Sequence, residues 1–370
     1  MTLFQLTLKN LSRRRVRTAL TIMGIGLGIG AVVALLGLAW GLEASWTDAY
    51  KVRKTDLVVR RSGGGLIAQP FPDTASEQVA KIPGVRAVSS LLTEVLSIED
   101  VPMMVVSGRQ WQSFLWENLK IVSGRLPHDA TEKVVVLGTL AAEMLEKKPG
   151  DRITIEIDDF EVVGIADGGA VVENGAIMIS LPLLQGLMQK DNMVNFINVR
   201  LDPDSRDPHT VSQIIQQQIP GCRVDIADEV LSQSDGVKTF KAMNWGTSII
   251  ALLVGTFGVM NTMFMSVFER TREIGILLAL GWKRSRILSM ILLESVTLCF
   301  AAGLFGIVAG IVLLKILAVM PWMQGRIEPQ ITAELLTLAL GLAIAVGVAS
   351  GLYPALHCTR INPSLAIRQV

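Results

Sequence analysis

The residues of this chain that could perform catalytic chemistry are few and scattered. Its three histidines are His128, His209 and His357, and none has the i, i+4 spacing of a helical metal site. The sequence contains neither a nucleophile elbow nor the G-x-x-x-x-G-K-[ST] motif that cradles the phosphates of ATP. The residue types therefore do not support an enzyme, and we expect no metal or cofactor to bind to this chain.

The most ordered arrangement of charged and apolar residues lies between Glu269 and Gly281. Its charged residues are one helical turn apart, where each pair can contribute about 0.3–0.5 kcal/mol. An apolar patch at i, i+3 and i+4 follows, and Gly281 predicts the end of a helix. We interpret this segment as a surface that binds a partner protein and receives force from it; the alternative is a basic loop that only connects two membrane helices. The residues of this predicted surface are Glu269, Arg270, Arg272, Glu273, Ile274, Gly275, Leu277, Leu278 and Gly281.

Four stretches without a charged side chain are long enough to cross a membrane. A helix needs roughly 20 apolar residues to span the hydrocarbon core, and these stretches contain 25, 27, 20 and 22 residues. They are Thr18–Leu42, Ala242–Phe268, Ser295–Leu314 and Leu335–Leu356. The first is too long for the apolar region of a signal peptide and is followed by no small-x-small cleavage site, so we interpret it as a retained anchor.

Lysine and arginine positions predict the orientation, because basic residues collect on the cytoplasmic side of a membrane. Twelve of them occur in the leader, in the 269–286 segment and in the tail. Both termini and the 269–286 segment are therefore expected in the cytoplasm, and the block 43–245 outside it. That block has 28 acidic and 20 basic residues, a net charge of −8, and the remainder has a net charge of +9. The asymmetry sets topology and gives no indication of nucleic-acid binding.

The block 43–245 has the pattern of a mixed α/β domain held together by its own core. It contains one cysteine, so no intrachain disulfide is expected there. The segments Thr74–Val88 and Pro208–Val224 each contain a helix signal, then Pro-Gly, then a strand signal, which predicts two β-α-β units with a β-rich insert between them. Separate strands are expected at Val85–Val88 and Thr93–Ile98, and a hairpin turn at Asp158-Asp159.

Polar and small residues within the spans are candidate contacts. Glu294 lies about two turns into the third span. A charge at mid-membrane costs at least about 2.5–3.5 kcal/mol, and less near the interface. A polar contact between helices and an interfacial glutamate both remain open. Glycines four residues apart let helices approach closely in lipid, although glycine is also simply common in membrane helices. The packing positions that we select are Gly24, Gly28, Gly306 and Gly310.

Two segments next to the spans have helical patterns of their own. Residues 3–11 carry leucine and phenylalanine on one face, which predicts an amphipathic helix on the inner leaflet; an ordinary basic leader is the alternative. Glu43–Thr55 and Asp228–Trp245 continue the first two spans without proline, and only Gly236 weakens the second. We expect both to extend the spans as a helical stalk.

The run Glu269–Gly281 resembles the coupling segment of MacB/FtsX-type ABC permeases, often written E-R-x-x-E-I-G-x-x-x-A-x-G. Gly258–Met263 and Tyr353-Pro354-Ala355 resemble the same family, as do Pro149-Gly150-Asp151 and Val162-Val163-Gly164 in the outer block. The resemblance covers essentially the whole chain. MacB itself carries a fused ATPase domain, which has no counterpart here, so the ATPase is expected on a separate polypeptide.

The resemblance implies the permease subunit of a bacterial ABC transport system, a non-catalytic subunit whose partner ATPase binds ATP and Mg. A second permease copy or a paralogue completes a dimer. Motion at the coupling segment then reaches the outer domain, which exports or extracts an amphipathic substrate. A periplasmic adaptor, an outer-membrane duct and membrane lipid are further expected partners. The alternative is a non-transport mechanical relay that regulates an extracytoplasmic enzyme or a sensor.

The expected fold is an α-helical membrane protein of the bacterial cytoplasmic (inner) membrane, with four transmembrane helices. An α/β extracytoplasmic domain is inserted between the first and second helices, and both termini are cytoplasmic. The expected order is a cytoplasmic amphipathic leader (1–17), transmembrane helix 1 (18–42), the α/β domain with stalk extensions (43–245), transmembrane helix 2 (246–268), the coupling segment (269–286), transmembrane helix 3 (287–314), a short external loop (315–334), transmembrane helix 4 (335–357) and a cytoplasmic tail (358–370).

Overall fold

The structure, a computed structural model, describes residues 15–61, 67–203, 207–230, 235–320, 323 and 327–359. These residues form two compact units. A helical unit comprises the described residues up to Leu38, those of Ala242–Ile316 and those from Ile331 onward. An α/β unit comprises those of Ala39–Lys241 and Leu317–Gln330. The predicted leader helix and the tail beyond Thr359 lie outside the described residues.

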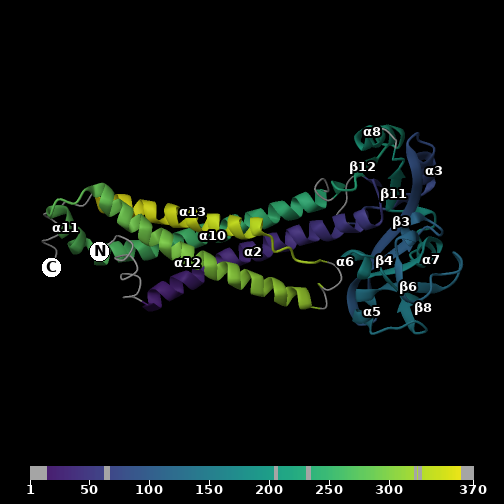
Figure 1. Ribbon diagram of the computed structural model, residues 1–370, viewed down its shortest axis with the longest axis horizontal. Coiled ribbons are helices and arrows are strands. Elements are labelled where there is room, and N and C mark those ends of the chain that lie inside the picture. The colour runs from purple at the N-terminus through teal and green to yellow at the C-terminus, as the bar shows by residue number, and fades with distance from the viewer. Residues whose placement is uncertain are drawn as a thin grey trace. The chain divides into compact units, whose positions relative to one another are not determined.

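Four helices of the described chain are long and apolar enough to cross a membrane by length and composition (Figure 1). They are α2 (Arg15–Val52), α10 (Asp235–Glu269), α12 (Arg284–Val319) and α13 (Ala333–Thr359). A short helix, α11 (Thr271–Ala279), lies between α10 and α12. The predicted fold class is confirmed, because a mixed α/β region separates the first of these helices from the second.

The first two of these helices continue beyond their apolar stretches. α2 runs without a break to Val52, and α10 begins at Asp235, so Gly236 is accommodated inside a helix. Residues 227–229 form a turn, and residues 231–234 of the predicted second stalk segment lie outside the described residues. The helical extension of both spans is thus confirmed for 43–52 and for 235–245.

The α/β unit is built on a ten-stranded sheet with the order β12-β1-β11-β3-β4-β9-β6-β8-β5, with β7 paired to β8. Its strands are β1 (Leu57–Arg61), β3 (Val85–Ile98), β4 (Val101–Arg109), β5 (Lys120–Gly124), β6 (Val134–Gly138), β7 (Arg152–Ile155), β8 (Asp158–Asp167), β9 (Ala176–Ser180), β11 (Phe196–Leu201) and β12 (Cys222–Ile226). A separate pair joins β2 (Phe71–Pro72) to β10 (Met193–Val194). The helices are α3 (Thr74–Ala80), α4 (Phe114–Glu117), α5 (Thr139–Leu145), α6 (Val171–Asn174), α7 (Leu181–Leu187) and α8 (Pro208–Gln218).

Two interleaved β-α-β units form one part of the sheet. β1 and β3 both pair antiparallel with β11, so the unit β1-α3-β3 is split by that strand. β11 and β12 both pair antiparallel with β1, so β11-α8-β12 is split in the same way. Each helix ends in a Pro-Gly turn in which Gly84 or Gly221 has a positive φ, a conformation that costs glycine little. The predicted pair of β-α-β units is therefore confirmed, with β4 to β9 as the insert.

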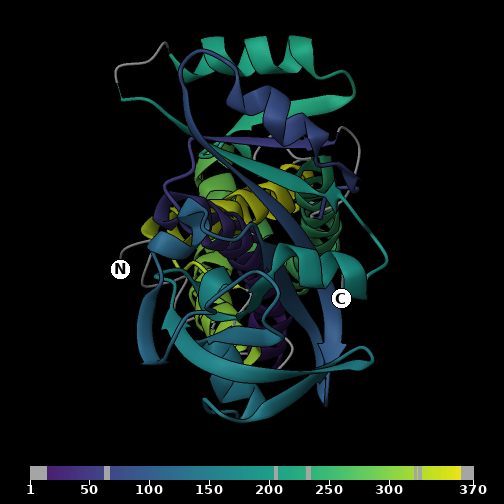
Figure 2. The same cartoon turned by 90° about the vertical axis from the view of Figure 1, so that its right-hand side faces the viewer.

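Both faces of the sheet carry buried side chains, because alternate residues of a strand point to opposite faces. One face packs against α3, α5, α7 and α8 in a single large core that includes Val59, Val106 and Val199. The helices α3 and α8 lie side by side on this face (Figure 2). The opposite face carries Val58, Leu91 and Phe196, which pack with α4 and with Tyr50 of α2. The C-terminal end of α2 is therefore part of the core of the α/β unit.

Two local predictions in the α/β unit are wrong. The two strands expected between Val85 and Ile98 are one strand of 14 residues, because β4 and β11 provide partners along its length. The hairpin turn falls at Glu156-Ile157 rather than at Asp158-Asp159. Glu156 takes the positive φ that this turn requires, and Asp159 instead pairs with Thr154 across the ladder.

Candidate functional site

The helix α11 has a clearly defined end. Gly281 has a φ of 85°, its N–H donates to the Leu278 carbonyl, and the Trp282 N–H donates to the Leu277 carbonyl. This pair of hydrogen bonds is the Schellman motif, which favours glycine because the position is left-handed. The predicted helix stop at Gly281 is confirmed.

The apolar residues predicted to form a partner surface turn toward the chain's own helices. Ile274 is 3% exposed and packs with Val267 of α10, Ile291 of α12 and Ala355 of α13. Leu278 is half-buried against the same cluster, Leu277 is also half-buried, and Gly275 is buried. Ile274 and Gly275 are thus packed inside the helical unit. The i, i+3, i+4 spacing found the buried stripe of an amphipathic helix, which a sequence alone cannot distinguish from a docking stripe.

The opposite face of α11 is open. Arg272 and Glu273 are exposed, as are Ile276 at 44% and Leu280 at 74%. The sequence reasoning included the two charged residues but missed the two apolar ones. The signal that could have found them is their phase, because Ile276 and Leu280 are four residues apart and lie off the stripe that contains Ile274.

Two ion pairs connect the start of α11 to other helices of the helical unit. Arg17 of α2 donates through Nη1 to Glu269 Oε2 at 3.2 Å. Arg270 donates through Nη1 to Glu294 Oε2 of α12 at 3.4 Å, and Glu294 is buried. Glu294 of α12 thus makes a polar contact with the residue that lies between α10 and α11, and its assignment to a coupling contact stays a prediction. The pair offsets part of the cost of a carboxylate inside the span.

Glycines bring α2 and α12 into contact, but only some of the selected ones do so. A Cβ at Gly306 would lie 2.6 Å from the Gly26 carbonyl oxygen, and one at Gly310 would lie 2.9 Å from that of Gly30. In contrast, a Cβ at Gly24 would meet nothing within 4 Å, and one at Gly28 would meet only a carbonyl oxygen at 3.8 Å. The assignment of Gly24 and Gly28 to close packing is therefore wrong within this chain.

Gly24 and Gly28 instead line an open groove between α2 and α10. The groove has a volume of about 880 Å³, and Gly255 and Gly258 line its other side. The close contact with α12 uses Gly26 and Gly30 because these two positions lie on the other side of α2. The four-residue spacing was the right signal, but two such pairs overlap in this helix, and only the fold decides which one meets a neighbour.

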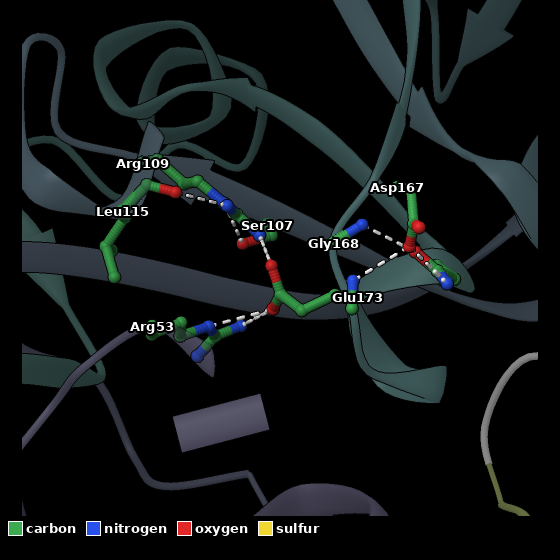
Figure 3. Close-up of polar contacts among 9 residues, drawn as sticks. Arg53, Ser107, Arg109, Leu115, Asp167, Gly168 and Glu173 are labelled. Carbon is green, nitrogen blue, oxygen red and sulfur yellow. Dashed lines mark hydrogen bonds and ion pairs between the residues drawn. The ribbon is translucent and has the colours of Figure 1, made fainter. Parts of the chain in front are cut away.

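A buried charge cluster at the C-terminal end of α2 was not predicted at all. Glu173 of α6 accepts from Arg53 through Oε1 and from Arg109 of β4 through Oε2, at 2.8 Å from Arg53 Nε and 2.6 Å from Arg109 Nη2 (Figure 3). Arg109 also donates to the Leu115 carbonyl at 2.8 Å and to Ser107 Oγ at 3.3 Å. We call Arg53, Glu173 and Arg109 the anchor triad. Its side chains are at most 7% exposed.

The electrostatics of the anchor triad favour the charged form of Glu173. Burial on its own raises the pKa of Glu173, but Arg109 and Arg53 oppose this effect and hold the pKa below its ordinary value of 4.5. Burial lowers the pKa of Arg109, and Glu173 opposes that shift. One carboxylate that bridges two guanidiniums satisfies both, which is the condition for tolerating charges in a core. The sequence gives no signal for this contact because 120 residues separate Arg53 from Glu173.

Two family models together match most of the chain. The model of the MacB-like periplasmic core domain matches residues 18–217, and that of the FtsX-like permease C-terminal region matches residues 245–363. Among solved structures, the periplasmic region of MacB from Actinobacillus actinomycetemcomitans is similar with a TM-score of 0.40 and 14% identity, over 50% of this chain and 97% of that one.

Two curated relatives align with nearly the whole chain. The chain is 26% identical to an uncharacterized ABC transporter permease of Methanocaldococcus jannaschii, over 97% of this chain and 96% of that protein. It is also 26% identical to the macrolide export ATP-binding/permease protein MacB of Bdellovibrio bacteriovorus, over 97% of this chain and 60% of that protein. This chain thus spans about three fifths of the length of that MacB. With one family model covering more than half of its residues, the chain belongs to the MacB/FtsX-type family of ABC transporter permeases.

Proposed function

We propose that this chain is the permease subunit of an ABC transport system that exports or extracts an amphipathic substrate. A partner ATPase binds ATP and Mg on the cytoplasmic side, and two permease copies, or a copy and a paralogue, form the membrane part. The positions of Lys and Arg support an inner-membrane orientation in which α11 is cytoplasmic and the α/β unit lies outside.

The observation that carries the proposal is the two-sided character of α11. Its inner face is fixed in the helical unit by Ile274 and by the ion pairs of Glu269 and Arg270. Its outer face presents Ile276 and Leu280 between charged residues. These two exposed apolar side chains are one helical turn apart and have charged neighbours, and an apolar patch with a polar rim is a feature of protein-binding surfaces. An ATPase that binds there displaces α11, and the ion pairs transmit this displacement to α2 and α12.

The test is co-purification with each ABC ATPase that the same genome encodes as a separate chain. Leu280→Asp and Ile276→Asp change the exposed face only, so we expect loss of ATPase binding with an unchanged melting temperature of the permease. The matched control is Ile157→Asp in the α/β unit, where an 89% exposed residue receives the same substitution and binding should persist. Undiminished ATPase binding by both α11 variants would refute the docking surface.

A further inference from the structure

We propose that Glu173 is a positioning residue that fixes the outer end of α2 to the sheet of the α/β unit, so that movement of α2 enters this unit at α6 and β4. This role rests on the proposed function, because α2 must move for its anchor to transmit anything. The joint itself is a property of the α/β unit and can be measured without the ATPase.

The anchor triad connects three elements through one carboxylate. Arg53 follows α2 directly, and its N–H continues the helix by donating to the Ala49 carbonyl at 3.1 Å. Glu173 belongs to α6, and Arg109 ends β4 and reaches the α4 carbonyl of Leu115. Each oxygen of Glu173 takes one guanidinium, so α2 cannot move away from β4 without breaking a charge-assisted hydrogen bond in a dry environment.

Apolar contacts close the same joint beside the charges. Ala49, Trp46 and Val52 of α2 pack against Ala170 and Val172 at the start of α6. These contacts lie on the α2 face that also presents Arg53. The helix end is therefore fixed by packing and by charge together, which leaves it little freedom to rotate against α6.

The segment that receives α2 is itself rigid. Asn174 accepts from the Gly168 N–H at 2.7 Å and donates to Asp167 at 3.1 Å, which closes the turn before α6. A Cβ at Gly168 would lie 2.4 Å from Cβ of Glu173, and one at Gly138 of β6 would lie 2.3 Å from the Asn174 carbonyl oxygen. With α6 in contact with β6 on one side and with α2 on the other, a displacement of α2 is passed to the sheet rather than absorbed.

A second contact holds the backbone of the turn directly after α2. Arg200 of β11 donates to the carbonyl oxygens of Arg53 at 3.2 Å and Lys54 at 3.1 Å, and its guanidinium lies 4.3 Å from the ring centroid of Phe114. A cation at a helix C-terminus is also favoured by the helix dipole. Arg200 holds the backbone of Arg53 and Lys54, whereas Glu173 holds the side chain of Arg53. Through Arg109, Glu173 also determines that β4 is the strand to which α2 is joined.

The experiment uses the full chain in lipid nanodiscs without nucleotide. Spin labels at Asp48→Cys on α2 and Lys120→Cys on β5, both exposed positions of the α/β unit, report the distance distribution across the joint. The native cysteines are replaced by alanine. The test variant is Glu173→Gln. Arg53→Gln is a second test variant that removes the link to α2 and leaves the Glu173–Arg109 pair intact, so the test can still be made if Glu173→Gln does not fold. The matched control is Glu132→Gln, which breaks another doubly bonded pair, that of Glu132 with Arg125, in a more exposed position.

We expect a narrow distance distribution in the parent chain and in Glu132→Gln, and a clearly broadened one in Arg53→Gln and Glu173→Gln. Amide exchange in 46–52 and 168–174 should rise at least about tenfold in these two variants, since a broken buried ion pair changes equilibria by more than that, while exchange in α8 stays unchanged. Arg53→Lys, which keeps one donor, should restore part of the narrow distribution. Equal widths in all variants would overturn the proposal. Failure of the proposed function would appear separately, as ATPase binding that Leu280→Asp does not reduce.

Discussion

Arg270 donates a hydrogen bond to Glu294 across 3.4 Å, so the residue directly before α11 is joined to the part of α12 that enters the membrane. Glu269, its neighbour in the chain, is paired with Arg17 at the start of α2. These two adjacent contacts connect the end of α10 to two other membrane helices. A displacement of α11 can therefore be transmitted to α2 and α12 through these two ion pairs, in addition to the backbone.

The two partners of the Arg270–Glu294 pair should differ in their tolerance to substitution. Arg270→Gln leaves an unpaired carboxylate within the span, at a cost of up to about 2.5–3.5 kcal/mol, the value for the centre of the membrane. Glu294→Gln leaves an arginine that can extend toward water by snorkelling, so its cost should be smaller. Melting temperatures of the purified permease in detergent measure both. A Glu294→Gln variant that is less stable than Arg270→Gln would contradict this account of the pair.

The glycine contacts between α2 and α12 predict opposite effects of one substitution. Gly306→Ala places a methyl group 2.6 Å from the Gly26 carbonyl and should destabilise the helical unit by about 1–3 kcal/mol. Gly24→Ala meets nothing within 4 Å and should gain up to about 1 kcal/mol from helix propensity. Thermal unfolding of the two variants in parallel is the measurement. Equal destabilisation by both would show that α2 packs through a different face.

The anchor triad predicts a dependence of stability on pH. The pKa of Glu173 is depressed below 4.5 in the folded state, so its contribution is fully present above that value and is lost as the pH falls below it. Urea unfolding of the fragment 43–230 should therefore show a parent chain more stable than Glu173→Gln by about 3–5 kcal/mol at pH 7. This difference should shrink below pH 4.5. A difference that stays constant down to pH 3 would mean that Glu173 contributes no ionic stabilisation.

The length of the fragment needed for a stable α/β unit follows from the same contacts. A fragment 56–230 retains β1 to β12 but lacks Tyr50 and Arg53, which leaves part of one core face open and Glu173 with one partner fewer. A fragment 43–230 restores both. We expect both to be monomers that fold in reducing buffer, since Cys222, their one cysteine, is free and no disulfide is needed. The longer fragment should have the higher melting temperature. Equal melting temperatures would indicate that α2 is not part of this core.

Local physical chemistry was sufficient to predict the four long helices and the paired β-α-β units of this chain, but not every strand boundary. Uncharged stretches gave the four long helices, because unpaired charges are costly in lipid, and the Pro-Gly turns at Gly84 and Gly221 marked the paired β-α-β units. Contacts between residues that are distant in the sequence could not be predicted in this way. The spacing of Ile274 and Leu278 identifies a stripe but not what covers it, and nothing near Arg53 in the sequence indicates Glu173. These missed features are choices of partner, which the tertiary fold makes, whereas the hairpin turn at Glu156-Ile157 was a local error of two residues.

The central claim is that nucleotide on a partner ATPase moves the outer ends of α2 and α10 through α11. The most direct measurement is the distance between spin labels at Lys238→Cys in the two copies of a permease dimer, bound to its ATPase in nanodiscs, with and without ATP. Lys238 is exposed near the start of α10. We predict a distance that shifts on ATP binding in the parent complex and does not shift when Leu280→Asp prevents docking. An unchanged distance in the parent complex, with the ATPase bound and turning over ATP, would contradict the account.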